Sequence, residues 1–320
     1  MSTLGELKSN ILSVISKMKE NLVSKGVQVS DADTLHTLAD KVNDIQGGEK
    51  VVLPGPDVSF QGKTFTDGGK WLEDVDTSNL TSGNKMLYKA IGISHLDLKG
   101  WDVSKMTTIR ECFSDTNIEY LDIRGWDFSS EDQDALLSTF SSVKQLLFDN
   151  DIVSGVKKLS STFRGCTNEL IDLSGSTAVV TSLDYTFMNC SLAKEIKFGN
   201  FDTSSVKSIR NLFYGCASLE TLDMSMLDLS GITDESFWSN SNNKLRSLKM
   251  NLNFPNLTTF WFNSSAYWTD ETVQWTLVEH SADRVAAGLQ PMTLNLHANT
   301  KAVLTEEQKE IITDKGYTIA

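Results

Sequence analysis

Short segments in which apolar and polar residues alternate recur along the middle of the chain at an almost constant spacing. Each segment opens with an apolar-x-apolar triplet, as in LDLKGWD and LDIRGWD, and successive triplets start 25 or 26 residues apart. An alternation with a period of two predicts a β-strand with one buried face. Seven such strands are predicted, and they start at Leu96, Leu121, Leu146, Ile171, Ile196, Leu222 and Leu248. A degenerate earlier copy starts at Lys70, and a later strand starts at Leu294 after a longer insertion.

The second half of each unit carries a large aromatic residue at a near-constant offset from the strand. We assign this position to Tyr88, Phe113, Phe140, Phe163, Phe187, Phe213 and Trp238. A unit of about 25 residues cannot bury an apolar face alone, so neighbouring units must stack into one continuous core. The predicted fold is therefore an α/β solenoid with one strand per turn and a parallel sheet. A helical or turn segment would return the chain on the far side.

The Trp-Asp pairs that follow two of the strands raise the question of a binding or catalytic motif. Asp-x-Ser segments occur after the strands at Asp102, Asp127, Asp202 and Asp228. The carboxylate of such a segment accepts a main-chain N–H that a turn leaves free. We therefore interpret the pairs as structural. A WD-repeat propeller is a poor alternative, because its unit needs about 40 residues and four strands.

Two stretches resemble a known family of repeats. The segments LDLKGWDVSKMTTIRECF and IKFGNFDTSSVKSIRNLFYGCASLETLDM are similar to the BspA-like leucine-rich repeats of bacterial surface proteins and phage virion proteins. Units of that family carry a strand, then Asn/Trp-Asp-Thr-Ser, and then Met/Leu-Phe-x-x-Cys. The resemblance covers residues 70–260 and departs at 146–151, where Asp149-Asn150-Asp151 replaces Trp-Asp. It implies a leucine-rich-repeat solenoid with a binding or scaffold role and no particular chemistry.

A small helical module is predicted in residues 1–50. Its first helix spans 4–25 and repeats apolar residues at three- and four-residue spacing. The apolar seam contains Leu4, Leu7, Ile11, Val14, Met18 and Leu22. The module either caps the solenoid or docks it to other chains through this seam, as in a coiled coil. It resembles short modules near the N-termini of phage tail and head-fibre proteins, which favours docking and a homo-oligomer, with a trimer preferred.

Altered repeats and a cap are expected in residues 261–320, because a solenoid needs an atypical final unit. A helix is predicted at 270–280 with Thr269 as its N-cap. A second helix follows Thr305, which stands at capping-box spacing from Gln308. Gly316 would end this helix, and residues 317–319 would form a last strand. The repeats proper run over 70–260, and residues 51–69 link the helical module to them.

The charge of the chain limits its partners. The net charge is −13 and the pI is near 4.8, which opposes nonspecific binding to nucleic acid or to an anionic membrane surface. No apolar run approaches the roughly 18 residues of a membrane span, and no signal-peptide core is found at the start. We expect a protein that is made in a bacterial cytoplasm and that leaves the cell by assembly or lysis, without membrane insertion.

The residue types that carry chemistry do not converge in this sequence. Cys166, Cys190 and Cys216 occupy one repeat position, so they should stack along the core as buried free thiols. The four histidines lie far apart without ligand spacing. The chain has no Gly-rich phosphate loop and no nucleophile elbow. We therefore expect no enzymatic activity, no cofactor and no metal.

A polar ladder is the first candidate for a binding surface. Alternate residues of each strand face outward, and this register exposes Asp97, Lys99, Asp122, Arg124, Asp149, Asp172, Asp223 and Lys249. Neighbouring strands lie about 4.8 Å apart. Asp97 and Asp122 would therefore repel each other unless Lys99 and Arg124 offset their charges. The ladder is either a solvated face or a recognition surface for a protein or a glycan.

An aromatic cluster is the second candidate. The stretch FPNLTTFWFNSSAYW contains Trp261, Tyr267 and Trp268. Exposed aromatic rings there could stack on sugars or anchor a partner. Alternatively, the rings form the core of the altered last units.

These observations favour a non-enzymatic structural protein of a phage virion, a head or tail fibre component that contacts other virion proteins and a host-surface glycan or protein. A bacterial surface adhesin of the same repeat family is the alternative. A carbohydrate-active enzyme is the third class, and no motif supports it.

Overall fold

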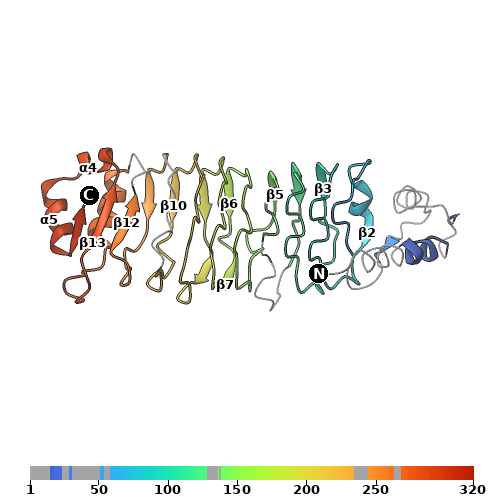
Figure 1. The fold of residues 1–320 in the computed structure, drawn as a ribbon, viewed down its shortest axis with the longest axis horizontal. Coiled ribbons are helices and arrows are strands. Elements are labelled where there is room, and N and C mark those ends of the chain that lie inside the picture. Colours follow the sequence, from blue (N-terminus) through green and yellow to red (C-terminus); the bar gives the residue numbers. More distant parts are fainter. Residues whose placement is uncertain are drawn as a thin grey trace.

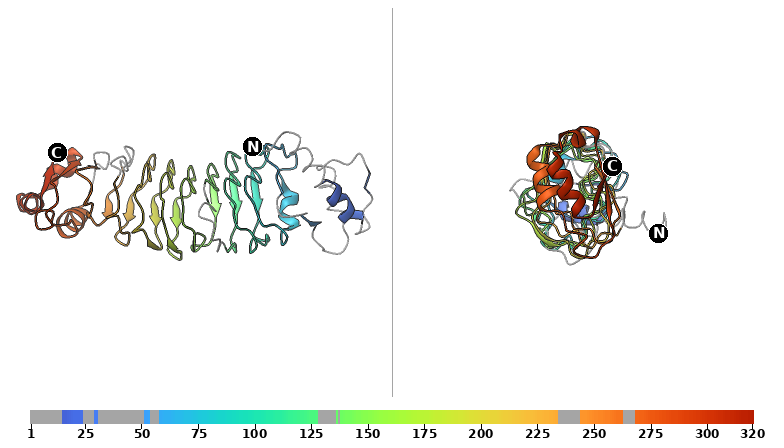
Figure 2. Two further views of the ribbon diagram at one scale, coloured as in Figure 1. Left: turned by 60° about the horizontal axis from the view of Figure 1, so that its bottom comes forward. Right: turned by 90° about the vertical axis from the view of Figure 1, so that its left-hand side faces the viewer.

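The structure, a computed structural model, describes residues 15–23, 29–30, 51–53, 58–127, 136, 138–233, 244–262 and 268–320. These ranges form one elongated body in which short strands stack along the long axis and helices gather at the ends (Figure 1). In the end-on view, successive coils overlie one another within a single rounded outline (Figure 2). Repeated parallel strands with little helix are consistent with a repeat solenoid, as the periodicity predicts.

The first row of strands contains the seven predicted ones, and each begins one residue before its predicted start. They are β3 (His95–Asp97), β4 (Tyr120–Asp122), β5 (Gln145–Leu147), β6 (Leu170–Asp172), β8 (Glu195–Lys197), β10 (Thr221–Asp223) and β11 (Ser247–Lys249). They form two parallel sheets, β3-β4-β5 and β6-β8-β10-β11. Leu96 pairs with Leu121, and Leu121 pairs with Leu146, so equivalent apolar residues stack in the core.

A second row of strands follows the first around the coil. It contains the parallel pairs β1 (Val51–Val52) with β2 (Val75–Asp76) and β7 (Thr177–Val179) with β9 (Asn200–Asp202). The degenerate copy predicted as a strand at Lys70 is instead the 3-10 helix η1 (Lys70–Asp74). Its consecutive residues Trp71 and Leu72 are both buried. A strand would place these two side chains on opposite faces, which explains why this copy is helical.

A ladder of phenylalanine rings runs through the core. Neighbouring rings lie about 6 Å apart and stack at small interplanar angles from Phe113 through Phe140, Phe163 and Phe187 to Phe213. The assignment of Tyr88 to this position is wrong by one residue. Leu87 is fully buried, and its N–H donates to the carbonyl of Cys112, as that of Phe113 does to Thr139. Trp238 lies outside the described residues.

The return segments of the described units are tight turns. Each turn contains two residues with positive φ, four positions apart, on either side of the ladder residue. The pairs are Lys85/Lys89, Glu111/Asp115, Ser138/Ser142, Ser161/Gly165, Tyr185/Asn189 and Asn211/Gly215. Left-handed conformations are costly for residues with a side chain, so neighbouring units must hold them in place. Buried threonines help, because Thr162 donates to the carbonyl of Leu136 and Thr186 to that of Leu159, each at 3.0 Å.

Helical residues replace the next strand of the first row beyond β11. They are α3 (Asp270–Thr272) and the π-helix η2 (Val273–Glu279). The hydroxyl of Thr276 donates to the carbonyl of Leu248 at 2.8 Å, and the N–H of Leu248 donates to the hydroxyl of Thr272 at 3.1 Å. The predicted N-cap is confirmed, because the side chain of Thr269 accepts a hydrogen bond from the N–H of Thr272.

The last strands form a separate parallel sheet of β12 (Thr259–Phe262), β13 (Met292–Leu296) and β14 (Tyr317–Ile319). The strand predicted at Leu294 is therefore present as β13, but it does not extend the first row. Helices α3 and η2 lie beside β11, where the next strand of that row would lie. Helices α4 (Ala298–Val303) and α5 (Glu306–Asp314) connect β13 to β14. The capping box predicted for Thr305 and Gln308 is confirmed at the start of α5.

A buried arginine fastens this C-terminal unit. The side chain of Arg284 is completely buried and donates to three carbonyls, of Gln290 at 2.7 Å and of Phe254 and Leu257 at 2.9 Å. The guanidinium also lies 5.9 Å from the ring centre of Tyr317. Carbonyl dipoles thus stabilise the buried charge and join the last unit to the preceding one.

The N-terminal end is covered by a helical segment at residues 15–23. Two of its residues, Met18 and Leu22, are fully buried and belong to the same apolar core as Leu53 and Val58. This part of the helix therefore acts as a cap on the solenoid. The other residues of the predicted docking seam lie outside the described residues, and docking through them stays a prediction: Leu4, Leu7, Ile11 and Val14.

Candidate binding surface

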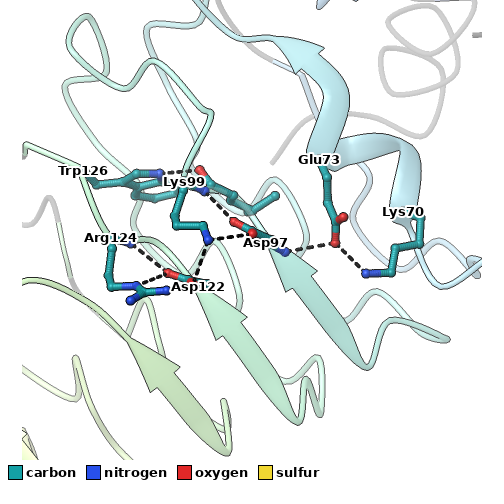
Figure 3. A network of polar contacts seen from close by, with 8 residues as sticks. Lys70, Glu73, Asp97, Lys99, Asp122, Arg124 and Trp126 are labelled. Atoms are coloured by element: carbon teal, nitrogen blue, oxygen red, sulfur yellow. Dashed lines mark hydrogen bonds and ion pairs between the residues drawn. The ribbon is translucent and has the colours of Figure 1, made fainter.

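Charged side chains from the first coils meet on the outer face of the first strand row (Figure 3). The Nζ of Lys99 lies 2.9 Å from a carboxylate oxygen of Asp97 and 3.4 Å from one of Asp122. Arg124 contacts the same Asp122 carboxylate through Nη2 at 2.7 Å and Nε at 3.0 Å. We call this group, together with Lys70 and Glu73, the charged strand face. The predicted offset of the two aspartates by Lys99 and Arg124 is confirmed.

The 3-10 helix η1 extends this network by one coil. A carboxylate oxygen of Glu73 accepts the N–H of Asp97 at 3.0 Å and also lies 2.8 Å from the Nζ of Lys70 (Figure 3). Glu73 therefore satisfies an edge N–H of β3 where no further strand is available. The charged strand face thus has a structural role at its N-terminal end.

Asp122 is the most enclosed member of the network. Only 2% of its side chain is exposed, because Lys99 and Arg124 cover it. Burial alone would raise the pKa of its carboxyl, but the hydrogen bonds and charge of Arg124, with the charge of Lys99, outweigh burial. The pKa of Asp122 is held below its ordinary value. A ligand would meet the exposed halves of Lys99 and Arg124 and not this carboxylate.

The other aspartates of the predicted ladder bind main-chain groups at the turns that follow the strands. Asp172 accepts the N–H of Ser174, and Asp223 accepts that of Ser225, both at 2.9 Å. A carboxylate oxygen of Asp149 accepts the N–H of Gly125 at 2.6 Å. Lys249, further along, lies 3.7 Å from Glu271. These residues are outward-facing as predicted, but their carboxylates serve the fold first.

Two further residues of the same face are not indicated by the sequence pattern of the ladder. His95 and Tyr120 pair in register on β3 and β4, and their rings stack with centres 5.9 Å apart. Each stands two positions before an aspartate of the ladder, so alternation along the strand places it on the same face. The sequence contains the alternation that places them there, but the predicted strands start at the first apolar residue of the triplet. They therefore begin one residue too late to include His95 and Tyr120. An aromatic pair therefore flanks Asp97 and Asp122.

The Asp-x-Ser segments that start at Asp102, Asp202 and Asp228 form Asx turns, as predicted, and the segment that starts at Asp127 runs outside the described residues. In the first full unit, a single carboxylate oxygen of Asp102 accepts both the N–H of Ser104 at 3.0 Å and its hydroxyl at 2.6 Å. Asp202 binds Ser204 in the same way. The serine hydroxyl, followed by the main-chain N–H, lowers the pKa of both aspartates. The Trp-Asp motif is thus structural on both of its residues, since Trp101 and Trp126 are buried.

The aromatic cluster divides between core and surface. Trp268 is only 5% exposed and packs against Phe262 with ring centres 4.6 Å apart, so it is a core residue and not part of a binding surface. Trp261, by contrast, is 45% exposed on β12. Alternation along β12 explains the exposure of Trp261, since Phe260 and Phe262 on either side of it point inward. Tyr267 lies outside the described residues.

The four cysteines are buried free thiols. The thiol of Cys190 donates to the carbonyl of Phe163 and that of Cys216 to the carbonyl of Phe187, each at 3.1 Å. Burial raises the pKa of Cys166 and of Cys216 to about 12. Such thiols are poor nucleophiles at neutral pH, so their place in the repeat is structural.

The described part of the chain contains no candidate metal cluster and no candidate membrane span. Within it, no three or more His, Cys, Asp or Glu side chains are grouped so that they could hold a metal ion. The helices of the same ranges include none with the length and hydrophobicity needed to cross a bilayer.

Comparisons with known proteins place the repeats in a family. A search of curated proteins finds no match for this chain. A family profile described as "Mycoplasma protein of unknown function, DUF285" matches twice, over residues 59–151 and 135–251. Together these matches run without a gap from residue 59 to residue 251 and include every strand of the first row. They cover more than half of the 320 residues, and the chain therefore belongs to the Mycoplasma DUF285 family of repeat proteins.

Proposed function

We propose that this chain is a non-enzymatic structural protein of a phage virion, a head or tail fibre component that also recognises the host surface. Its repeats are then leucine-rich repeats of the BspA-like type. The observation that carries the proposal is the unbroken ladder from Phe113 to Phe213 inside one elongated body. A rod with a continuous apolar core keeps its two ends at a fixed separation, which is what a fibre segment needs.

A non-catalytic role is supported by how the reactive groups are used. The carboxylates of the charged strand face are bound to lysine, arginine or main-chain N–H groups, and the thiols are buried with raised pKa values. Structural ion pairs and turn caps of this kind hold side chains fixed. They are the opposite of a carboxylate poised near neutral pH for proton transfer.

The recognition role is supported by the exposed parts of the same face. His95 and Tyr120 form a flat aromatic pair, and the half-exposed Lys99 and Arg124 stand beside it. Aromatic rings with adjacent charged donors are typical of surfaces that bind proteins or glycans. In the proposed particle, residues of the N-terminal seam that lie ahead of Met18 contact other virion proteins and join the chains into a homo-oligomer, with a trimer preferred. The chain is made in the host cytoplasm and is incorporated there.

Immunogold electron microscopy of the producing culture tests this proposal. Antibodies raised against residues 51–320 should label phage particles, and the position of the gold would separate head from tail. Label confined to cell envelopes would contradict the virion proposal. An unrelated cytoplasmic protein, labelled in parallel, controls for particles contaminated by lysate.

A bacterial surface adhesin is the second candidate, and one observation favours it. The family profile that matches residues 59–251 takes its description from Mycoplasma, which is a bacterium. In this case the gold would lie on intact, unpermeabilised cells and would be lost after mild protease treatment of those cells.

A further inference from the structure

A row of threonines crosses the C-terminal sheet in strict register. Thr259 of β12 pairs with Thr293 of β13, and Thr293 pairs with Thr318 of β14. All three side chains are on the outer face, since Phe260, Leu294 and Tyr317 beside them are buried. Neighbouring strands stand about 4.8 Å apart. The sheet therefore presents hydroxyl groups at a regular spacing along a straight line.

An exposed indole stands at the first strand of the same face. Trp261 lies two residues after Thr259, is 45% exposed, and pairs in register with Asn295. The Asn295 amide donates to the carbonyl of Phe260 at 3.4 Å, which holds it on the sheet beside the ring. A flat apolar ring next to fixed amide and hydroxyl groups matches the two sides of a sugar, its C–H face and its hydroxyl edge.

A hollow of about 460 Å³ lies at the last strand of this face. This volume is within the range of pockets that hold small ligands. The hollow is lined by Lys301, Lys309, Thr313, Tyr317, Thr318 and Ile319. Thr318 belongs both to the hollow and to the threonine row, so the row leads from the indole of Trp261 to the hollow. The two lie two strands apart, about 10 Å.

The charge of the hollow is positive on a strongly acidic protein. Lys309 lies 2.8 Å from Glu306, whose side chain is 92% exposed, and such a surface pair holds its lysine weakly. Lys301 is half-buried and forms no ion pair within the described residues. Two ammonium groups with the hydroxyl of Thr318 are suited to a carboxylate, which accepts several hydrogen bonds at once. The hydroxyl of Thr313 already donates to the carbonyl of Lys309 at 2.7 Å and lines the hollow without a free donor.

We propose that the β12-β13-β14 face binds an acidic polysaccharide, with a uronate carboxylate in the hollow between Lys301 and Lys309 and a further sugar ring on Trp261. The proposal rests on the host-recognition role proposed above and names its ligand class. Among the described residues, the exposed face and its hollow offer hydroxyl, amide and ammonium groups together with the ring of Trp261. This composition fits a hydrated sugar chain better than a protein, whose binding patch would need more apolar area.

Calorimetric titration of the full chain with a tetramer of galacturonic acid tests the proposal. The fully methyl-esterified tetramer is the matched ligand, because it keeps the sugar backbone and removes the charge. We expect the acid to bind and the ester to bind at least about tenfold more weakly. The double variant Lys301→Ala/Lys309→Ala should lose a similar factor for the acid alone. The variant Trp261→Ala should weaken both ligands, with Trp261→Phe restoring part of the affinity.

The variant Lys105→Ala is the matched control, because this exposed lysine lies in a turn of the coil that follows β3, in a different part of the chain from β12, β13 and β14, and belongs to neither candidate surface. Its affinity for the acid should be unchanged. No binding of the acid, equal binding of the ester, or full binding by the Lys301/Lys309 double variant would overturn the proposal. Circular dichroism spectra that match the wild type show that each variant is folded. The immunogold result is independent, so gold on particles without uronate binding rejects this inference and leaves the virion proposal standing.

Discussion

The indole N–H of Trp126 donates to the carbonyl of Leu98 in the preceding coil at 2.8 Å, and the ring stacks on Trp101 with centres 6.0 Å apart. Trp101 repeats the bond one coil earlier, to the carbonyl of Leu72 at 2.7 Å. The Trp-Asp motif, which looks like a signature of function, therefore joins neighbouring coils. Its hydrogen bond and its ring both act on the neighbouring unit.

Replacing Trp126 separates these two contributions. Trp126→Ala should lower the free energy of unfolding by about 3–5 kcal/mol, because it empties a buried site and removes one of the two donors of the Leu98 carbonyl, which keeps the N–H of Trp101. Trp126→Phe keeps most of the ring and should cost only the lost hydrogen bond, about 0.5–1.5 kcal/mol. Urea unfolding followed by circular dichroism measures both changes. Equal losses for the two variants would mean that the hydrogen bond alone matters.

Arg284 should be essential to the C-terminal unit. Arg284→Ala removes a donor from three carbonyls, of which that of Phe254 keeps the N–H of Leu257 at 3.3 Å. A buried carbonyl left unsatisfied costs about 1–3 kcal/mol. Thermal unfolding should therefore begin at a lower temperature in this variant. Arg284→Lys should restore little, because an ammonium cannot reach three carbonyls with the geometry of the guanidinium fork. The exposed Arg246→Ala is the control, and a loss of the same size there would contradict a specific role.

Acid should weaken the solenoid through its aspartates. The folded state lowers the pKa of Asp122, and also of Asp102, Asp172, Asp202 and Asp228, so the unfolded chain binds more protons at low pH. Stability is then complete above the unfolded aspartate pKa of about 3.9 and is lost as the pH falls through the lower folded values.

Asp122→Asn tests one part of this dependence. It should be less stable than the wild type at pH 7, because Arg124 and Lys99 lose their charged partner, and the difference should shrink as the pH falls below 4. Chemical unfolding at a series of pH values gives both curves. Parallel curves down to the lowest pH would show that the pKa of Asp122 is not lowered by folding.

The thiols should be inert until the core opens. Burial raises the pKa of Cys112, Cys166 and Cys216 to about 12 and that of Cys190 well above its ordinary value. A thiol-specific chromogenic reagent at pH 8 should therefore react with none of the four in the folded protein and with all four in guanidinium chloride. Rapid reaction of one thiol without denaturant would locate a coil that opens on its own.

Sequence reasoning predicted the features that depend on local periodicity or local capping. The strand spacing, the Asx turn at Asp102, the N-cap Thr269 and the capping box at Thr305 all follow from the identity of nearby residues. The stacked register of equivalent leucines follows from the repeat itself.

The remaining features depend on contacts between coils. Leu87, and not Tyr88, takes the ladder position because the left-handed residues Lys85 and Lys89 decide which side chain points inward. No local pattern reveals that geometry. The shift of the last strands into a separate sheet likewise follows from helical residues that occupy the place beside β11. Trp261 and Trp268 belong to one aromatic stretch of the sequence, and only the fold decides that the first ring is exposed and the second is buried.

The stacking of the phenylalanine rings has a consequence for how such proteins change in length. Ring-to-ring distances from Phe113 to Phe213 vary only between 5.8 and 6.1 Å, so each coil repeats the geometry of the last. Gain or loss of one gene segment that encodes a coil would lengthen or shorten the rod by one strand spacing, about 4.8 Å. Both ends would keep their surfaces. The number of coils therefore sets the distance between the two ends of the molecule. This distance can change only in steps of one whole coil.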